Sequence, residues 1–398
     1  MPNLTVQQIK DTIVEFHGDR GYRLFEPFPL VSTDPTVLFV NATITPFKTW
    51  FTSNTTCPED YALIQGCLRM GGANELDLVG INPYYFTFFE MFGSGMFRAD
   101  HEEAVAYLLD FLMAFGISED RLYFTTPIEG KFQRALKRNG VREDRVFQLA
   151  ENDHFWQEWR FGTPGPVGHG LTVVLSRSSK QVESIEQLIV EDDQFLELLN
   201  LIHVHSESLA SGEVVPIANP GFELGIGIER LAAALQGCNS YLIDSIRPLV
   251  QTAEESLLAQ GGVDNTPIAR VCADHFRAIC VLSLGGLNPS NKGHGYVLRK
   301  LVRRFVGTIW AHIGEITTTK TLVEDLSQTL ATHGCLTGIH ECADVVDRIV
   351  QEEQALSRVL KRAKQHVLRY PNTSTYVLHD TYGVPEKLAP LLLKGGEL

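Results

Sequence analysis

The change from strand-like to helical patterning near residue 240 constrains the fold of this chain more than any other feature. Before that point, β-prone runs at Tyr61–Met70, Tyr84–Phe92 and Leu171–Leu175 are separated by segments rich in glycine and proline. After Cys238, almost every segment as far as Tyr370 has apolar residues at helical spacing. Strands that occur in runs, rather than in regular alternation with helices, indicate an α+β fold with an antiparallel sheet.

We therefore predict two domains. Residues 1–240 should form an antiparallel sheet flanked by helices, and residues 241–398 an all-helical domain. The first domain should end in a helix over Ile228–Gln236, because Gly237 is a natural helix stop. The second should contain a long helix over Ala343–Tyr370, where apolar residues form a single stripe.

Local patterns add three expectations. The runs on either side of the glycine-rich segment 71–83 should pair as a β-hairpin with a long tip. Residues 5–18 carry apolar side chains at helical spacing, and Thr5 is a suitable N-cap for that helix. The apolar run Val37–Val40 is strand-like.

Composition and charge exclude several classes of protein. The 398 residues are 44% hydrophobic, which is enough to bury a large core, and the net charge of −14 excludes a protein that coats nucleic acid non-specifically. The seven cysteines include no C-x-x-C pair, so we expect buried thiols in a reducing compartment and no metal site. No stretch is long and apolar enough to cross a membrane. We expect a soluble, cytoplasmic protein.

Several nucleotide-binding and hydrolytic motifs do not occur in the sequence. There is no P-loop, no H-E-x-x-H and no G-x-S-x-G. The pair Gly225 and Gly227 is not followed by the third glycine of a dinucleotide-binding fingerprint. Dinucleotide, zinc-protease and serine-hydrolase functions are therefore disfavoured.

Two other segments have the features of a nucleotide site. Arg69 ends a β-prone run beside a flexible loop, where a guanidinium can bind a phosphate, and Phe89 on the return strand can stack on a base. Gly225 and Gly227 permit close approach of the backbone to a ligand, and Arg230 follows at a helix start. Taken alone, each pattern also fits an ordinary core strand or a solvated turn.

The order and spacing of these segments resemble the class II aminoacyl-tRNA synthetases, and in detail the alanyl-tRNA synthetase family. The resemblance extends over about residues 5–385. The segments that carry it are Asp34–Ala42, Arg69–Gly80 with Thr87–Met91, Phe155–Gln157 with Gly165–Pro166, and Gly225–Leu235. The family's editing and C-terminal domains have no counterpart in this sequence, so we expect catalytic and tRNA-recognition domains only.

The resemblance implies roles for individual residues in a site that uses ATP and Mg²⁺. Arg69 would hold the α-phosphate of ATP, and Phe89 and Arg230 would enclose the adenine. Gly225 and Gly227 would line the ATP site, and Arg69, Arg230 and Glu223 would act in catalysis. The pocket for a small amino acid, alanine by default, would be lined by Trp156, Asn200, Glu223 and Gly225.

A second set of residues would bind tRNA. Arg299, Lys300, Arg303 and Arg304 share one helix face and form a basic strip on an acidic chain, which suits a phosphate backbone. The alternative is a solvated helix face. The resemblance further implies that Asn291 and Asp380 read the G·U pair of an alanine-type acceptor stem in its shallow groove.

Departures from the family pattern concentrate in the catalytic half. Ala73 stands where the family has a lysine that neutralises the triphosphate, and Tyr85 and Phe86 replace a pair of histidines. Glu223 replaces an aspartate that meets the substrate amino group, and it is one methylene longer. His169 lies in a segment that has lost its acidic residue, although a lone histidine is more often structural.

Three functions remain open on this basis. The first is an aminoacyl-tRNA ligase, which activates its amino acid with ATP. The second is a repurposed relative, an ATP-independent aminoacyltransferase that passes the aminoacyl group of charged tRNA to a small metabolite. The third is a non-catalytic tRNA-binding protein. The dependence on ATP discriminates among them, and the sequence leaves the oligomeric state open.

Overall fold

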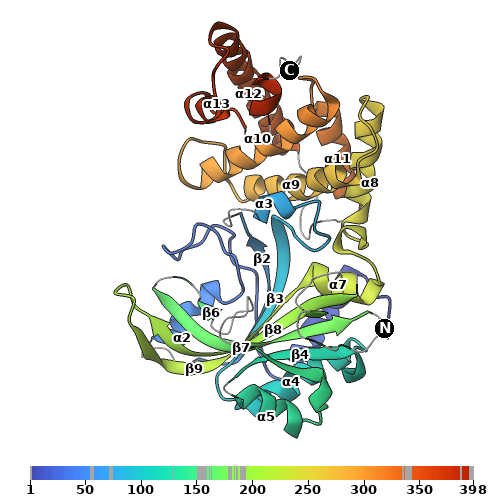
Figure 1. Ribbon diagram of the computed structural model, residues 1–398. Coiled ribbons are helices and arrows are strands. Elements are labelled where there is room, and N and C mark those ends of the chain that lie inside the picture. Colours follow the sequence, from blue (N-terminus) through green and yellow to red (C-terminus); the bar gives the residue numbers. More distant parts are fainter. Residues whose placement is uncertain are drawn as a thin grey trace. The chain divides into compact units, whose positions relative to one another are not determined.

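The computed structural model describes residues 2–53, 58–70, 75–128, 130–149, 159–160, 162, 164–177, 182, 184, 187–188, 194–333, 336, 343–385 and 388–393 (Figure 1). The chain divides into two compact units. Unit 1 comprises Met1–Leu68 and Phe89–Ile243, and unit 2 comprises Arg69–Phe88 and Asp244–Leu398. The tip of the predicted hairpin therefore belongs to the same unit as the C-terminal helices.

Unit 1 is built on a nine-stranded sheet in the order β1-β2-β3-β9-β8-β7-β4-β5, and β6 pairs with β7. The strands are β1 Arg23–Phe25, β2 Tyr61–Leu68, β3 Phe88–Met96, β4 Leu122–Pro127, β5 Val146–Leu149, β6 Trp159–Arg160, β7 Gly165–Ser176, β8 Phe195–Ser208 and β9 Val214–Gly227. The pairs β3–β9, β9–β8, β8–β7 and β7–β4 are antiparallel, whereas β1–β2 and β4–β5 are parallel. The predicted antiparallel sheet is thus confirmed at its centre, with a parallel pair at each edge.

Helices cover one face of this sheet, here called the helix face. On this face lie α1 Val6–Gly18, α4 His101–Ala114, α5 Lys131–Arg138 and α7 Ile228–Gln236. The helix α2 Lys48–Thr52 lies on the opposite face, because its Phe51 packs against Ile202, the register partner of Glu223. The 3₁₀ turns of unit 1 are η1 Thr45–Phe47, η2 Glu119–Arg121, η3 Glu143–Arg145 and η4 Ser240–Leu242. Phe92 of β3 packs against α1 and α4, with ring centroids 4.7 Å from His17 and 5.2 Å from Phe111. Phe222 of β9 packs against α4 and α5, 4.9 Å from His101 and 6.2 Å from Phe132.

Local sequence signals account for several element ends. Thr5 caps α1 in a capping box with Gln8, and Gly237 ends α7 in the left-handed conformation with φ +66°. Both predictions are confirmed. The predicted strand at Val37–Val40 is wrong, because the segment makes only an isolated bridge between Val31 and Phe39. Beyond this bridge, the carbonyl of Val40 accepts a hydrogen bond of 2.9 Å from the N–H of Leu68 at the end of β2.

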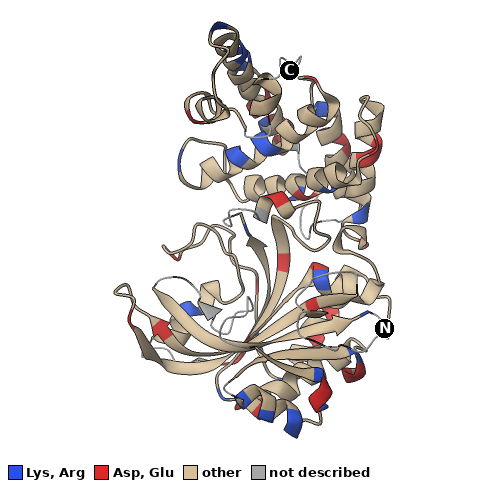
Figure 2. Ribbon diagram, in the orientation of Figure 1, with Lys and Arg blue, Asp and Glu red and all other residues tan. Residues whose placement is uncertain are grey.

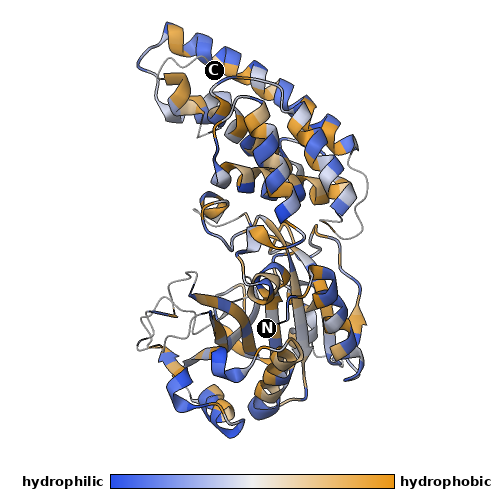
Figure 3. Ribbon diagram, turned by 90° about the vertical axis from the view of Figure 1, so that its right-hand side faces the viewer, coloured by the Kyte–Doolittle hydropathy of each residue, from blue (hydrophilic) through white to orange (hydrophobic). Residues whose placement is uncertain are grey.

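Unit 2 is helical in its described part, and its residues 69–88 contribute one short helix. Its helices are α3 Glu75–Leu78, α8 Arg247–Ala259, α9 Thr266–Leu284, α10 Gly293–Ile313, α11 Lys320–His333, α12 Ala343–Arg369, α13 Thr375–Tyr382 and α14 Ala389–Leu393. The long helix predicted over Ala343–Tyr370 is α12, which buries its apolar stripe and exposes its polar side (Figure 3). Among the described residues, no helix is both long and apolar enough to cross a membrane.

Candidate functional site

Glycines line the face of the sheet opposite to the helix face. Antiparallel partners point to the same side, and the strand register places Gly93 opposite Gly225, and Gly225 opposite Asn200. In the next row, Gly95 lies opposite Glu223. We call this side of β3, β9, β8 and β7 the glycine face. It leaves room for other side chains or a ligand directly above the backbone.

Two side chains from outside these strands occupy part of that room. A Cβ atom at Gly93 would lie 2.1 Å from Oγ1 of Thr43, and one at Gly95 would lie 2.1 Å from the ring of Tyr61. Both contacts are possible only because the sheet has no side chain there. Thr43 and Tyr61 are fully buried, and both lie near Glu223.

Glu223 is the buried acid of this face. Its side chain is 3% exposed, and it accepts a hydrogen bond of 2.6 Å from the hydroxyl of Thr43. Burial raises the pKa of Glu223 to about 7, although the Thr43 hydrogen bond acts in the opposite direction. Burial, together with the charge of Glu223, raises the pKa of Tyr61. The arrangement favours a cationic ligand group, because such a group would stabilise the ionised carboxylate.

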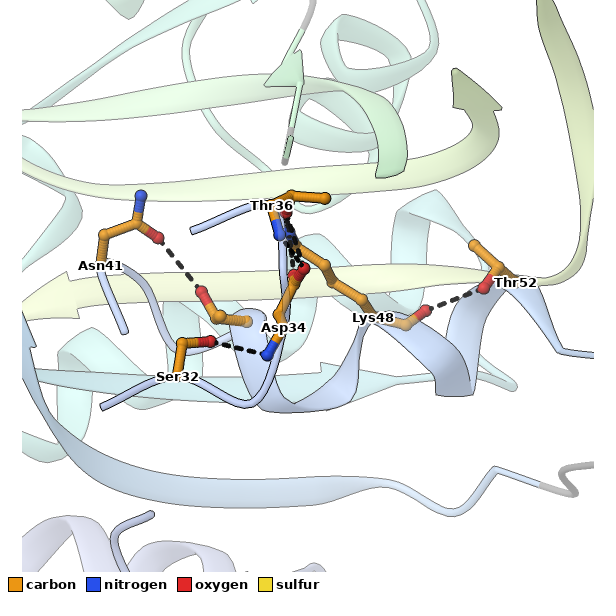
Figure 4. A network of polar contacts seen from close by, with 7 residues as sticks. Ser32, Asp34, Thr36, Asn41, Lys48 and Thr52 are labelled. Atoms are coloured by element: carbon orange, nitrogen blue, oxygen red, sulfur yellow. Dashed lines mark hydrogen bonds and ion pairs between the residues drawn. The ribbon is translucent and has the colours of Figure 1, made fainter. Parts of the chain in front are cut away.

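A polar network holds the segment that carries Thr43 (Figure 4). Nζ of Lys48 donates to Asp34 at 2.5 Å and to Thr36 at 3.0 Å. Burial alone would raise the pKa of Asp34, but the Lys48 and Thr36 hydrogen bonds hold it below its usual range. Thr45 in turn donates to Asn41 at 3.1 Å. The predicted motif 34–42 thus fixes the loop from which Thr43 reaches Glu223.

Asn200 and Arg230 both form hydrogen bonds to Glu197 of β8. Asn200 accepts from the hydroxyl of Thr172 at 2.6 Å, and its Nδ2 donates to Oε1 of Glu197 at 3.0 Å. Nη1 of Arg230, in the first turn of α7, donates to the carbonyl of Glu197 at 2.9 Å. These contacts bring together two residues that were predicted to bind different parts of the substrate.

Phe89 lies on the same face as these residues. The alternation of β3 places it on the side of Gly93 and Gly95, and it is half-buried. The adjacent Glu90 points the other way, where it pairs with Lys10 at 2.6 Å, and its backbone N–H donates to the carboxylate of Glu229. The register therefore puts Phe89, Gly225, Glu223 and Asn200 on one surface of unit 1.

Arg69 and Trp156 are the remaining predicted site residues of the catalytic half. Arg69 is exposed, directly after β2, and its backbone N–H donates to the carbonyl of Thr87 at 2.9 Å. It belongs to unit 2. Trp156 and the loop residue Ala73 lie outside the described residues.

Substitution of Gly93 by alanine tests the packing of the glycine face. We expect Gly93→Ala to displace Thr43, weaken its hydrogen bond to Glu223 and lower the free energy of unfolding by about 1–3 kcal/mol, as overpacking does. Urea unfolding measures this loss. Gly18→Ala is the matched control, because a Cβ atom there meets nothing within 4 Å. Equal urea midpoints for the two variants would show that Thr43 can move at no cost.

The raised pKa of Glu223 predicts a pH dependence of stability. Because its pKa in the folded chain is about 7 against an ordinary 4.5, the folded state binds this proton more tightly. Stability from this group is therefore present below pH 4.5 and is lost as pH rises to about 7, by about 3 kcal/mol. We therefore expect the free energy of unfolding of Glu223→Gln, measured in urea and taken relative to the wild type, to rise by this amount between pH 4.5 and pH 8. If the difference in unfolding free energy between Glu223→Gln and the wild type stayed constant across that range, the burial of an ionisable carboxyl would be contradicted.

Unit 2 contains a buried polar network between its hairpin tip and its helices. Asp274 of α9 accepts from the backbone N–H of Thr87 at 2.8 Å and from Nδ1 of His275 at 2.8 Å. Nε of Arg304 donates to Nε2 of His275 at 3.1 Å, which assigns the proton of the neutral ring to Nδ1. Arg304 also donates to the carbonyl of Leu76 at 2.5 Å. The network fixes segment 75–88 to α9 and α10.

A further network connects the two residues predicted to read the tRNA acceptor stem. Arg299 donates to Asn291 and, at 2.8 Å, to Glu352 of α12. Arg303 donates to the same Glu352 oxygen at 2.6 Å and contacts the carbonyl of Gly383. Gly383 directly follows α13, which carries the exposed Asp380. Asn291 and the end of α13 are thus joined through one buried carboxylate.

These contacts give most cations of the strip predicted on α10 partners within unit 2, and the tRNA-binding role of the strip stays a prediction. Arg299, Arg303 and Arg304 are engaged with groups of unit 2, whereas Lys300 is exposed. Periodicity correctly placed the four side chains along one side of a helix. It could not show that a carboxylate some fifty positions later, Glu352, would bind two of them.

Sequence reasoning missed Thr43, Tyr61 and Glu352. A signal was present for the first two, because Gly93 and Gly95 occupy alternate positions of a strand and so mark one face as open. No comparable signal marks Glu352 among the charged residues of its helix.

Comparison with known proteins identifies the family. The profile described as "tRNA synthetases class II (A)" matches residues 8–397. The chain belongs to this family. It is 31% identical over 413 residues to the alanine–tRNA ligase of Idiomarina loihiensis, covering 98% of this chain and 47% of that protein. It is 35% identical over 314 residues to the alanine–tRNA ligase of a Caulobacter species, covering 76% of this chain and 35% of that protein.

The class II synthetase chain spans about half the length of the curated relatives it matches. Among solved structures, the histidyl-tRNA synthetase of S. aureus matches with a TM-score of 0.36 and 11% identity, over 58% of this chain and 66% of that one. The resemblance to the alanyl-tRNA synthetase family seen in the sequence is confirmed by the family profile and the curated relatives.

Proposed function

We propose that this class II synthetase chain activates a small amino acid, alanine by default, with ATP and transfers it to a tRNA with an alanine-type acceptor stem. The amino acid and ATP would give an aminoacyl-adenylate and pyrophosphate. The aminoacyl group would then pass to the tRNA with release of AMP.

One observation carries this proposal. Glu223 is a buried carboxylate with one hydrogen bond from Thr43, on a face of the sheet that glycines keep open. A carboxylate in this position is costly unless a ligand supplies a positive group. The ammonium group of an amino acid is such a group.

The other residues of the glycine face fit the nucleotide. Phe89 and the guanidinium of Arg230 offer the two flat surfaces that an adenine ring requires. Glu197, half-buried beside Asn200, offers carboxylate oxygens of the kind that Mg²⁺ prefers. The guanidinium of the exposed Arg69 has the geometry to bind a phosphate. Catalysis would then rest on positioning and on stabilisation of charge.

The deciding experiment is pyrophosphate exchange with a panel of amino acids, followed by charging of an alanine tRNA transcript with and without ATP. We expect exchange with alanine or another small amino acid, and charging that requires ATP.

The loss of the family's lysine at Ala73 favours a second candidate, an aminoacyltransferase that needs no ATP. It would show no exchange but would release the aminoacyl group of pre-charged tRNA to an added amine. Binding of tRNA without either reaction would leave the non-catalytic function. Each result overturns the ligase proposal in a distinguishable way.

A further inference from the structure

The C-terminal half of α12 carries a concentration of positive charge on an acidic chain. The net charge of the protein is −14, yet no Asp or Glu occurs between Glu353 and Asp380. Four exposed cations of this stretch, here called the α12 cation row, are Arg358, Lys361, Arg362 and Arg369. Figure 2 shows blue bands along this part of α12.

The four cations share one face of the helix. At 100° per residue, positions i, i+3, i+4 and i+11 fall within a sector of about 100° and extend over roughly 17 Å. The buried residues Leu356, Leu360 and Ala363 lie on the opposite side. Within the described part of the chain, no ion pair or side-chain hydrogen bond engages any of the four cations. Their charge is therefore available to a partner.

The α10 helix has fewer exposed cations than α12. Arg299 and Arg303 are bound to Glu352, and Arg304 is bound to His275 and Leu76, so Lys300 alone of the predicted strip is exposed. A protein that holds a nucleic-acid backbone needs several exposed cations, because most of its affinity comes from phosphate contacts. In unit 2 the α12 cation row supplies them.

Two exposed tyrosines follow this row in the chain. Tyr370 follows the end of α12 and is 55% exposed, and Tyr376 in the first turn of α13 is 71% exposed. Tyr376 precedes Asp380 by four residues, so the two side chains lie on the same side of α13. Exposed tyrosines beside cations suit unpaired bases of RNA, which stack on aromatic side chains.

We propose that the α12 cation row and Tyr376 form a second RNA-binding surface, which holds the backbone of the same tRNA that Asn291 and Asp380 would read. This inference rests on the proposed function. The rings of His366 and Tyr382 lie 4.9 Å apart, so α13, which carries Tyr376 and Asp380, packs against the half of α12 that carries the row. An anionic membrane is the weaker partner, because a membrane-surface helix must insert an apolar face, and that face of α12 is buried.

The test is salt-dependent binding of an alanine tRNA transcript, followed by fluorescence anisotropy. In the triple variant Lys361→Ala, Arg362→Ala and Arg369→Ala, we expect at least about a tenfold loss of affinity at low salt. The slope of log affinity against log salt should become shallower by about 2–3. Tyr376→Ala should weaken binding without a change of slope.

The matched control removes three exposed cations of unit 1, Lys137, Arg138 and Arg142, which changes the net charge equally. It should leave affinity and slope close to those of the wild type. Circular dichroism of each variant shows whether the fold is kept.

The outcomes separate this inference from the proposed function. If the wild type binds tRNA and the α12 triple variant binds equally well, the inference is overturned and the proposed function stands. If the triple variant loses binding to anionic lipid vesicles but keeps tRNA binding, the surface faces a membrane instead. If the wild type binds no tRNA, both proposals fail together.

Discussion

Glu223→Gln should abolish most of the amino-acid-dependent pyrophosphate exchange while the fold is kept. The glutamine preserves the side-chain length and an acceptor for Thr43, so the change removes only the charge. Leaving a buried ammonium group without its partner costs about 2–5 kcal/mol, which corresponds to a loss of roughly 30-fold to several thousandfold in affinity for the amino acid. This loss of affinity should appear as a higher KM for the amino acid, while KM for ATP stays unchanged.

The pH profile of the wild type provides an independent measure of the same interaction. With a pKa of about 7 in the free enzyme, Glu223 is protonated in part at neutral pH. The apparent affinity for the amino acid should therefore fall about tenfold for each pH unit below 7, because a neutral carboxyl does not attract an ammonium group. The glutamine variant should lack this dependence.

A matched control comes from an exposed acid. Glu213 lies between β8 and β9 at the surface, and Glu213→Gln makes the same chemical change without touching the glycine face. It should leave KM for the amino acid unaltered. If Glu223→Gln also kept the wild-type KM, the carboxylate would not meet the amino group, and the proposed function would lose the observation that carries it.

The sequence predicted the elements of unit 1 better than their mutual register. Periodicity and capping residues located α1, α7 and the central strands, because those signals are local. That Gly93 lies in one row with Gly225 and Asn200 depends on the pairing of β3 with β9, more than a hundred residues later, which no local pattern specifies. The resemblance to a family supplied Glu223 as a candidate, but not the Thr43 hydroxyl or the burial that shifts its pKa.

The same limit applies to unit 2. Helical spacing located Arg299 and Arg303 on one side of α10, yet their exposure depends on Glu352, whose position follows from tertiary packing. A cation on a helix is accessible only if no acid of another element reaches it. Exposed cations of this unit concentrate instead on α12, in a stretch of sequence that contains no Asp or Glu.

Asp274→Ala should destabilise unit 2 by about 3–5 kcal/mol, the cost of removing one partner from a buried charged network. Asp274 is fully buried, and it accepts from the backbone N–H of Thr87 and from the ring of His275. Both donors would be left unsatisfied in the interior. Urea unfolding measures the loss, and hydrogen exchange should show faster exchange of the amides of residues 75–88.

Two variants make this result specific. Asp274→Asn keeps an oxygen for the Thr87 N–H and should recover part of the stability. Asp325→Ala removes an exposed acid of α11 in the same unit and should change stability by less than about 0.5 kcal/mol. Unchanged protection of residues 75–88 in Asp274→Ala would mean that contacts other than this network hold the hairpin tip.

The functional consequence follows from Arg69. Its backbone N–H pairs with the carbonyl of Thr87, the residue whose own N–H is bound by Asp274. A more mobile Thr87 should therefore increase the mobility of the strand end that carries the Arg69 guanidinium. As a result, the rate of pyrophosphate exchange should fall even at saturating substrate. Because a guanidinium must be held in place before it can stabilise a phosphate at the transition state, the loss should appear in kcat. A loss confined to KM would instead indicate that Arg69 contributes only to ground-state binding.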